Sequence, residues 1–235
     1  MEQKKQTIAV IGGTGALGSG LARRWAAAGY PVVLGSRKAE KAVQAAEEMN
    51  AGGFPHAVRG MANGEAAGAG DIVVLTVPFA HHEGILAEIR EAVQGKIVVD
   101  ATAPLVPPKV GRVQLPESDS AACMAQEALG ENVRVVSAFQ NVSAHKLDGH
   151  EPVNCDVLVC GDKKEARQVV VDLIAPLGLR GVHAGPLANS TAAEALTSVL
   201  ITINRLYKTD GAGIRITGNL ENAPVGSPQA ADARP

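Results

Sequence analysis

The sequence predicts an α/β protein, a doubly wound parallel sheet followed by a small C-terminal α/β domain. Short runs of β-branched, apolar residues alternate with helix-like segments through the first 140 residues, and a glycine-rich turn follows the first of these runs. This alternation is typical of parallel strands joined by right-handed helical crossovers. We expect a first domain over 1–150, a small second domain over 151–217, and a disordered tail over 218–235, where Gly, Pro, Ala and Asn dominate.

The first domain alternates regularly between the two kinds of element. Strands are predicted at 7–11, 31–35, 56–59, 71–76, 96–100 and 133–138. Helices are predicted at 16–28, 38–50, 61–68, 79–93 and 118–129, the last with Ser118 as its N-cap. The proline-rich stretch 102–117 between them is predicted to be a loop.

The second domain shows a looser pattern. Residues 156–160 and 179–183 predict two strands, with a helix over 163–175 between them. A long, mostly apolar helix is expected over 189–208, and the segment 211–216 closes the fold.

The first strand and the turn after it predict a dinucleotide-binding site. Thr7–Ile11 is a buried-type strand, and Gly13-x-Gly15-x-x-Gly18 follows it directly. In a Rossmann fold these glycines allow, in order, the tight turn, the approach of backbone to a pyrophosphate, and close helix packing. Helix N-termini also attract anions. A tight turn with no ligand is the alternative, but the strand–turn–helix context favours the dinucleotide.

The end of the second strand indicates which dinucleotide binds. NAD-binding folds usually carry an Asp or Glu there, which accepts hydrogen bonds from the ribose 2′-OH. This chain has Ser36 and Arg37 instead, with Lys41 about one helical turn further on. A hydroxyl, a guanidinium and an ammonium suit a 2′-phosphate. A merely solvated basic helix start is the alternative, but cations there oppose the helix dipole. The sequence therefore favours NADP.

Other candidate residues follow later strands at the same sheet edge. Val77, Pro78 and His81 follow the fourth strand, where ligands lie in such sheets. Gln140, Asn141 and Val142 follow the sixth strand and are expected to meet the substrate, although an ordinary surface loop is the alternative. His81 and His145 are the weak candidates for a catalytic role; a packing or surface histidine is the commoner case.

Composition limits the remaining possibilities. The net charge of −2 suggests neither a nucleic-acid partner nor an anionic membrane surface. There is no run of about 18 apolar residues for a membrane helix and no recognisable signal peptide. Three unpaired cysteines argue against a disulfide framework, and the histidines lack metal-ligand spacing. We expect a cytoplasmic protein that binds no metal.

Several motifs together resemble the NADPH-dependent coenzyme F420 reductases (F420H2:NADP oxidoreductases). They are spread over residues 7–217, nearly everything but the tail. The matching runs are Gly12–Gly18, Gly35–Lys41, Leu75–Pro78 with His81, Lys96–Asp100, Val135–Ala138, Val159–Asp162, Ala184–Ser190 and Gly213–Arg215.

The resemblance implies specific contacts. The two cofactors would be NADP and coenzyme F420, the deazaflavin lying in a cleft between the two domains of a protein that is commonly a dimer. The pyrophosphate would be held by Thr14, Gly15, Ala16 and Leu17. Ser36, Arg37 and Lys41 would take the 2′-phosphate, and Val77, Ala144 and Ala212 would border the nicotinamide.

The chain departs from some relatives where the family faces the deazaflavin. Those relatives carry a histidine and a proline at the positions of Gln140 and Ser143. Three functions therefore stay open at this point: hydride transfer between NADP(H) and F420, NADPH-dependent reduction of a flavin or other small acceptor, and a non-catalytic NADP sensor. Hydride transfer needs chiefly orientation of two rings, so the absence of a catalytic triad is expected.

Overall fold

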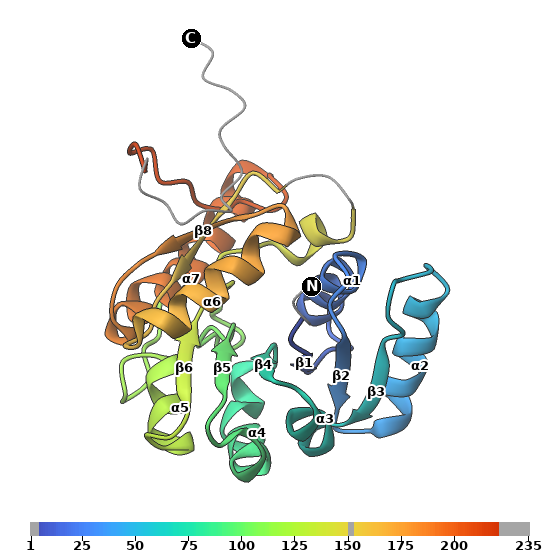
Figure 1. The fold of residues 1–235 in the computed structure, drawn as a ribbon. Coiled ribbons are helices and arrows are strands. Elements are labelled where there is room, and N and C mark those ends of the chain that lie inside the picture. The colour runs from blue at the N-terminus through green and yellow to red at the C-terminus, as the bar shows by residue number, and fades with distance from the viewer. Residues whose placement is uncertain (1–4, 150–152, 221–235) are drawn as a thin grey trace.

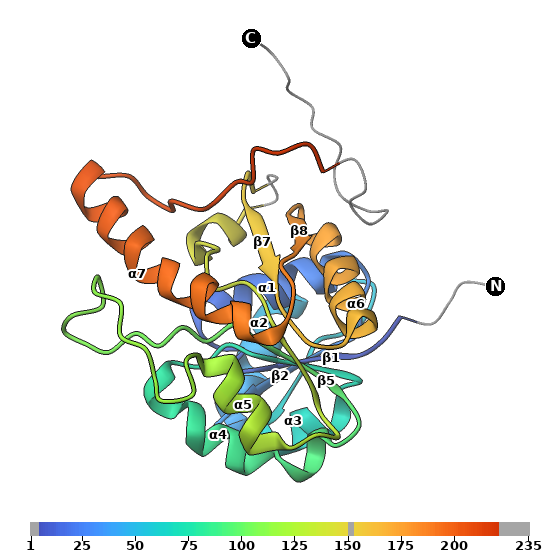
Figure 2. The same ribbon diagram turned by 90° about the vertical axis from the view of Figure 1, so that its left-hand side faces the viewer.

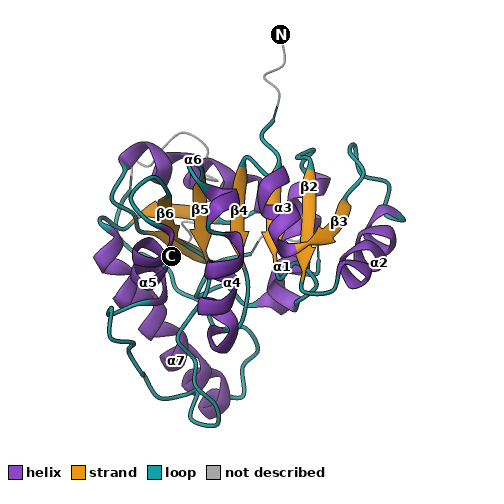
Figure 3. Cartoon of the chain, turned by 90° about the horizontal axis from the view of Figure 1, so that it is seen from below, coloured by secondary structure: helices purple, strands orange, loops and turns teal. Residues whose placement is uncertain are grey.

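The computed structural model describes residues 5–149 and 153–220, and its centre is a six-stranded parallel sheet (Figure 1). Its strands are β1 Ile8–Ile11, β2 Val32–Ser36, β3 Arg59–Ala62, β4 Ile72–Leu75, β5 Ile97–Asp100 and β6 Arg134–Ser137. They lie in the order β3-β2-β1-β4-β5-β6, which Figure 3 shows from below. The order reverses beside β1, which creates the crevice where such sheets bind ligands.

Helices cover both faces of this sheet. They are α1 Ala16–Ala27, α2 Ala39–Asn50, α3 Asn63–Ala69, α4 His82–Ile89 and α5 Ala121–Leu129 in the first part of the chain, then α6 Lys164–Ile174 and α7 Ser190–Tyr207. Alternate strand residues enter two separate cores: Ile8 and Val10 pack with α1, α2 and α6, whereas Ala9 and Ile11 pack with α3, α4 and α5. The predicted doubly wound α/β fold is confirmed.

A second, two-stranded parallel sheet follows, made of β7 Asp156–Val159 and β8 Arg180–His183. An antiparallel bridge between Ser137 and Cys160 joins it to the edge of β6. Ile214 accepts a hydrogen bond from Asp156 N, so the 211–216 segment lies beside β7. The proposed boundary near residue 150 stays a prediction, and residues 221–235 of the predicted tail lie outside the described residues.

Several predicted elements were wrong at their ends. The third strand is shifted from 56–59 to Arg59–Ala62, because Asn50 pairs with Val58 N and O and holds 51–58 as a loop. The predicted helix 79–93 is an α-helix only over His82–Ile89, flanked by 3₁₀ turns. Ser120, not Ser118, caps α5 by accepting a hydrogen bond from Cys123 N.

Long-range contacts tie α1 to the second half of the chain. The Arg24 guanidinium is buried and donates to the carbonyls of Lys146, Leu147, Gly149 and Leu177. Trp25 lies edge-on to Phe139, with ring centroids 6.0 Å apart. The last turn of α1 is thereby fixed relative to the segment that leaves β6. No helix among residues 5–149 and 153–220 combines the length and apolar character needed to cross a membrane.

Candidate functional site

The site begins with the turn between β1 and α1. Gly12 N and Gly13 N both donate to Gly35 O at 3.1 Å, so the turn is anchored on β2. Gly12 has a φ of 77°, a conformation that suits glycine, and a Cβ there would lie 2.8 Å from a Val77 methyl group. Gly13, the glycine predicted to allow the tight turn, has no room for a side chain either, because its Cβ would lie 2.8 Å from Val10 O, whereas the positive φ belongs to Gly12.

The start of α1 is open to an anion. Gly15 is the N-cap and supplies no side-chain bond, and Thr14, Gly15 and Ala16 are exposed. The first N–H groups of a helix lack intrahelical partners and carry the positive end of its dipole. A Cβ at Gly18 would lie only 2.5 Å from Thr76 Oγ1, so glycine is needed where α1 crosses the end of β4.

A pocket of about 580 Å³ lies at the carboxyl edge of the sheet, over the end of β2. Eight predicted cofactor-binding residues line it: Thr14, Gly15, Ser36, Arg37, Lys41, Val77, Pro78 and His81. Five others were not predicted: Gly12, Lys38, Asn63, Thr76 and Ile85. Gly13, Ala16, Leu17 and Gly18 belong to the adjoining turn and helix start, whereas Ala144 and Ala212 lie outside this lining.

The basic residues are arranged to receive an anion. Arg37 and Lys41 are exposed, and neither forms a hydrogen bond or ion pair with its side chain within the described part of the chain. Ser36 is mostly buried, and its Oγ accepts from Lys38 N at 3.4 Å, which leaves the O–H free to donate. The glycine turn and these three side chains fit a dinucleotide that carries a phosphate on its adenosine ribose.

The predicted substrate segment occupies a different environment. Gln140, Asn141 and Val142 are buried. Gln140 Nε2 donates to Asp100 O and Ser137 Oγ, both at 2.8 Å, and Asn141 Nδ2 donates to Ala193 O at 2.8 Å. These amides hold the end of β6 to β5 and α7, and their role toward a substrate stays a prediction. His145 is exposed on the next turn.

A buried histidine–aspartate pair beside the pocket was not predicted. His82 Nε2 lies 2.6 Å from Asp100 Oδ2, and neither side chain is more than 1% exposed. Asp100 Oδ1 accepts from Thr102 N, so the pair ties the start of α4 to the end of β5. His82 and Asp100 are 18 positions apart, so no local motif in the sequence predicts that they pair. The only signal for the pair was that both residues lie near strand ends.

A second buried acid, Glu194 of α7, docks on the start of α5. Its two carboxylate oxygens accept from Ala121 N at 2.7 Å and Ala122 N at 3.1 Å. Burial raises the pKa of Glu194 to about 8, and the nearby Asp100 adds to this increase, whereas the two backbone donors lower it. Long-range packing thus places a weakly acidic carboxyl between the first domain and α7.

Comparison with known proteins agrees with this geometry. Residues 7–104 match the model of the family described as "NADP oxidoreductase coenzyme F420-dependent". The F420-dependent NADP reductase of Methanocaldococcus jannaschii is 42% identical over 223 residues, which cover 91% of this chain and 99% of that protein. That of Methanothermobacter thermautotrophicus is 41% identical, over 89% of this chain and 94% of its own.

The chain belongs to the F420-dependent NADP oxidoreductase family. The resemblance stated from the sequence motifs is confirmed, since the match to these oxidoreductases spans nearly all of both chains. A crystal structure of a candidate F420-dependent NADP reductase from Arthrobacter sp. FB24 is also similar, at 25% identity and a TM-score of 0.76. The alignment covers 91% of this chain and all of that one, so the C-terminal part is shared as well as the sheet.

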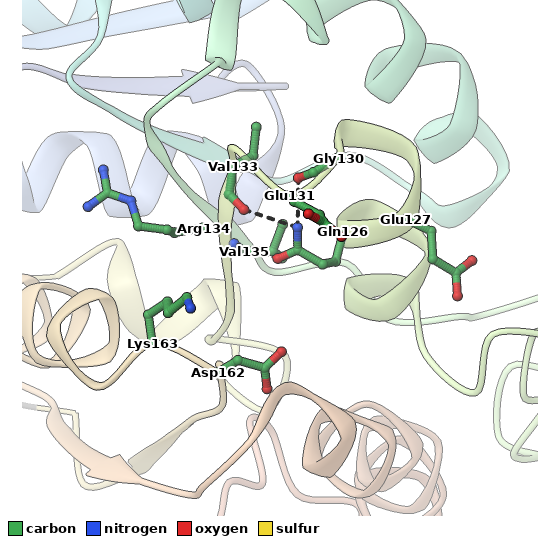
Figure 4. Close-up of a pocket in the computed structure, with 9 residues that line it drawn as sticks. All are labelled: Gln126, Glu127, Gly130, Glu131, Val133, Arg134, Val135, Asp162 and Lys163. Atoms are coloured by element: carbon green, nitrogen blue, oxygen red, sulfur yellow. Dashed lines mark hydrogen bonds between the residues drawn. The ribbon is translucent and has the colours of Figure 1, made fainter.

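Figure 4 shows a second pocket of this family member, with a volume of about 680 Å³. It lies where β6 begins, at the amino edge of the parallel sheet. Gln126 there already bonds Gly130 O, Val133 O and Val135 N, and Asp162 accepts from Leu187 N. Because this pocket has no glycine turn and its central polar groups are already paired, the smaller pocket is the candidate cofactor site.

Proposed function

We propose that this protein transfers hydride between NADP(H) and coenzyme F420. One observation carries the proposal: Ser36, Arg37 and Lys41 line the same pocket as the glycine turn, in a chain that aligns over 91% of its length with an F420-dependent NADP reductase. The pocket supplies the NADP half of the reaction, and the family supplies the identity of the acceptor.

The protein residues bind and orient. The α1 N-terminus, with Thr14 to Leu17, holds the pyrophosphate, and Ser36, Arg37 and Lys41 hold the 2′-phosphate. Both rings carry their own redox chemistry, so the residues need only align the rings and exclude water.

The nicotinamide end is proposed to lie toward Val77, Pro78 and His81, with Ala144 and Ala212 on its far side. Thr102 Oγ1 lies 3.5 Å from Val77 O, and the His82–Asp100 pair fixes Thr102 N, so this wall rests on a rigid support. Gln140, Asn141 and Val142 are proposed to shape the acceptor side by holding the backbone after β6. His81 and His145, both exposed, stay weak candidates for hydrogen bonding a ring edge.

We also propose a cytoplasmic homodimer. Its support is an apolar surface on the outer part of α7, the helix that projects from the rest of the ribbon in Figure 2. Val199, Leu206 and Tyr207 are exposed there. Thr202 Oγ1 donates to Gly111 O, so this part of α7 is joined to the proline-rich loop. That loop exposes Val106, Val113 and Leu115. Exposed apolar patches of this kind mark interaction surfaces.

An NADPH oxidation assay with F420, FMN and FAD as separate acceptors tests the function. We expect turnover with F420 and not with the flavins. Turnover with flavins alone would replace F420 by a flavin acceptor, and tight NADPH binding without any turnover would indicate a sensor. Measured against NADH, the F420 reaction should prefer NADPH; a preference for NADH would contradict the assignment of the pocket.

A further inference from the structure

Asn63 is the first residue of α3 and lines the NADP pocket although no part of the sequence motif contains it. Ser36 pairs with Ala62 in the β2–β3 register, so Asn63 comes one step beyond Ser36 at the same sheet edge. The side chain is 1% exposed. It lies under the adenosine end of the pocket, beside the residues that take the 2′-phosphate.

The Asn63 amide has no hydrogen-bond partner among residues 5–149 and 153–220. Its Oδ1 is buried without a hydrogen bond, and its Nδ2 forms none with any described residue. Other structural asparagines are paired: Asn50 Nδ2 donates to Val58 O at 2.9 Å, and its Oδ1 accepts from Val58 N at 2.8 Å. A buried amide without a partner costs free energy. A ligand that completes its hydrogen bonds accounts for its presence in a binding pocket.

The surroundings of Asn63 suit a flat, heteroaromatic base. The lining that Asn63 shares includes the exposed Arg37 and the apolar side chain of Ile85. A Cβ at Gly35 would lie 3.1 Å from Asn63 Oδ1, so the amide takes space that Gly35 leaves open. With the 2′-phosphate held by Ser36 and Arg37, the attached base must lie within this part of the pocket.

An asparagine amide complements the edge of adenine. It accepts from the exocyclic N6 amino group and donates to a neighbouring ring nitrogen, the pairing that proteins use to read adenine. The terminal torsion of asparagine is broad, so the amide can turn toward the base at low cost. A purely apolar floor would hold any flat ring equally well.

We propose that Asn63 is a specificity-determining residue that hydrogen bonds the adenine edge of NADP. This inference rests on the proposed function, because it requires NADP in the pocket. It adds a contact to the base, whereas the glycine turn and the basic residues contact only phosphates.

The test compares Asn63→Ala with the unaltered protein for two ligands, NADP and the analogue whose adenine carries an etheno bridge across N1 and N6. The bridge removes the N6 donor and blocks N1. We expect the variant to bind NADP about tenfold more weakly, about 1.4 kcal/mol, and to bind the analogue within about twofold of the unaltered protein. Equal losses for both ligands, or no loss for NADP, would overturn the proposal.

Stability separates this role from a structural one. Removal of an unpaired buried amide should leave the thermal midpoint of ligand-free Asn63→Ala unchanged or higher. The control Asn50→Ala, which breaks a paired amide far from the pocket, should lower the midpoint and leave NADP affinity unchanged. Asn63→Ser should repeat the ligand contrast should the alanine variant fold poorly.

Failure of the proposed function has a different signature. If the unaltered protein does not bind NADP at all, the pocket assignment itself is wrong. If it binds NADP and Arg37→Ala weakens that binding selectively while Asn63→Ala does not, then only the role of Asn63 is wrong.

Discussion

Arg37 and Lys41 place their charges on exposed side chains at the mouth of the pocket, and no protein carboxylate among the described residues neutralises them. Cations near a helix N-terminus oppose its dipole. Their position is therefore costly to α2 without a ligand and favourable with one. In the proposed function, the single residues that matter most at this site act on phosphates, through charge or through the absence of a side chain.

Arg37→Ala should raise the dissociation constant for NADP at least tenfold, about 1.4 kcal/mol, because it removes a cation that contacts the 2′-phosphate. Binding of NAD should change by less than about twofold. Titration calorimetry with both dinucleotides measures the difference. Lys163→Ala, which removes a cation from the other pocket, is the control. Equal losses of NADP and NAD affinity would refute the 2′-phosphate contact.

Gly18→Ala and Gly84→Ala should have opposite effects although both glycines lie within helices. A Cβ at Gly18 would meet Thr76 Oγ1 at 2.5 Å and Gly12 O at 2.9 Å, so α1 must shift away from the turn. We expect weaker NADP binding and a loss of stability of roughly 1–3 kcal/mol, typical of overpacking. A Cβ at Gly84 meets nothing within 4 Å, and alanine should stabilise α4 by up to about 1 kcal/mol. Chemical denaturation of both variants checks this; a neutral Gly18→Ala would contradict the close approach.

Helix docking is the main theme at the scale of secondary structure elements. Arg24 links α1 to two carbonyls in the second half of the chain, those of Leu147 and Leu177. Glu194 links α7 to the first N–H groups of α5, next to a hydrogen bond between Ser190 Oγ and Ser120 Oγ at 2.7 Å. Each contact joins elements that are distant in sequence: Arg24 holds α1 to the segments that follow β6 and α6, and Glu194 holds α7 to α5.

The docking of α7 should weaken as pH rises. The pKa of Glu194 is about 8 in the folded protein and near 4.5 when unfolded, so between these values the folded state holds the extra proton. Its contribution is present below pH 4.5 and is lost progressively up to about pH 8. Relative to Glu194→Gln, the unaltered protein should therefore lose free energy of unfolding across this range, by roughly a few kcal/mol at most.

Urea denaturation of both proteins at several pH values between 5 and 8 measures this difference. The groups facing Glu194 include Asp100, which is paired with His82. They also include Cys160, whose pKa is raised to about 11 mainly by burial. Because these groups are present in both proteins, only the difference between the two pH profiles reports on Glu194. Parallel profiles would show that the folded carboxyl titrates normally.

The whole molecule presents α7 and the proline-rich loop on one side, and α2 on another (Figure 1). The outer end of α7 leaves Leu206 71% and Tyr207 78% exposed, which is unusual for large apolar side chains without a partner. A second copy of the chain is the occupant that we propose for this surface.

The double variant Leu206→Glu/Tyr207→Ser should therefore be monomeric, because a charge replaces apolar area at the interface. Light scattering coupled to gel filtration measures the mass. Val43→Glu is the matched control, since Val43 is an exposed apolar residue on α2, and it should leave the dimer intact. A monomeric unaltered protein would refute the dimer.

The glycine turn and the pocket residues Ser36, Arg37 and Lys41 could be found from the sequence because their geometry is local. A strand, a turn and a helix start follow one another within 12 residues from Thr7 to Gly18, and Ser36 to Lys41 lie within two helical turns. The sequence also predicted most strands, since runs of apolar, β-branched residues indicate a buried strand whatever it packs against. The predicted start of an element was wrong where a side-chain hydrogen bond determines it, as the Asn50 bond does before β3 and the Ser120 bond does before α5.

Only the tertiary structure placed Asn63 in the pocket, paired His82 with Asp100 and set Glu194 on α5. His82 and Glu194 are separated from their partners by many residues, and Asn63 follows a strand, β3, whose position was wrongly predicted. Sequence periodicity reports which face of an element is buried, but it does not report what that face meets. The cofactor could therefore be predicted from residues that are adjacent in the sequence. The packing around the pocket depends instead on contacts that exist only after the chain has folded.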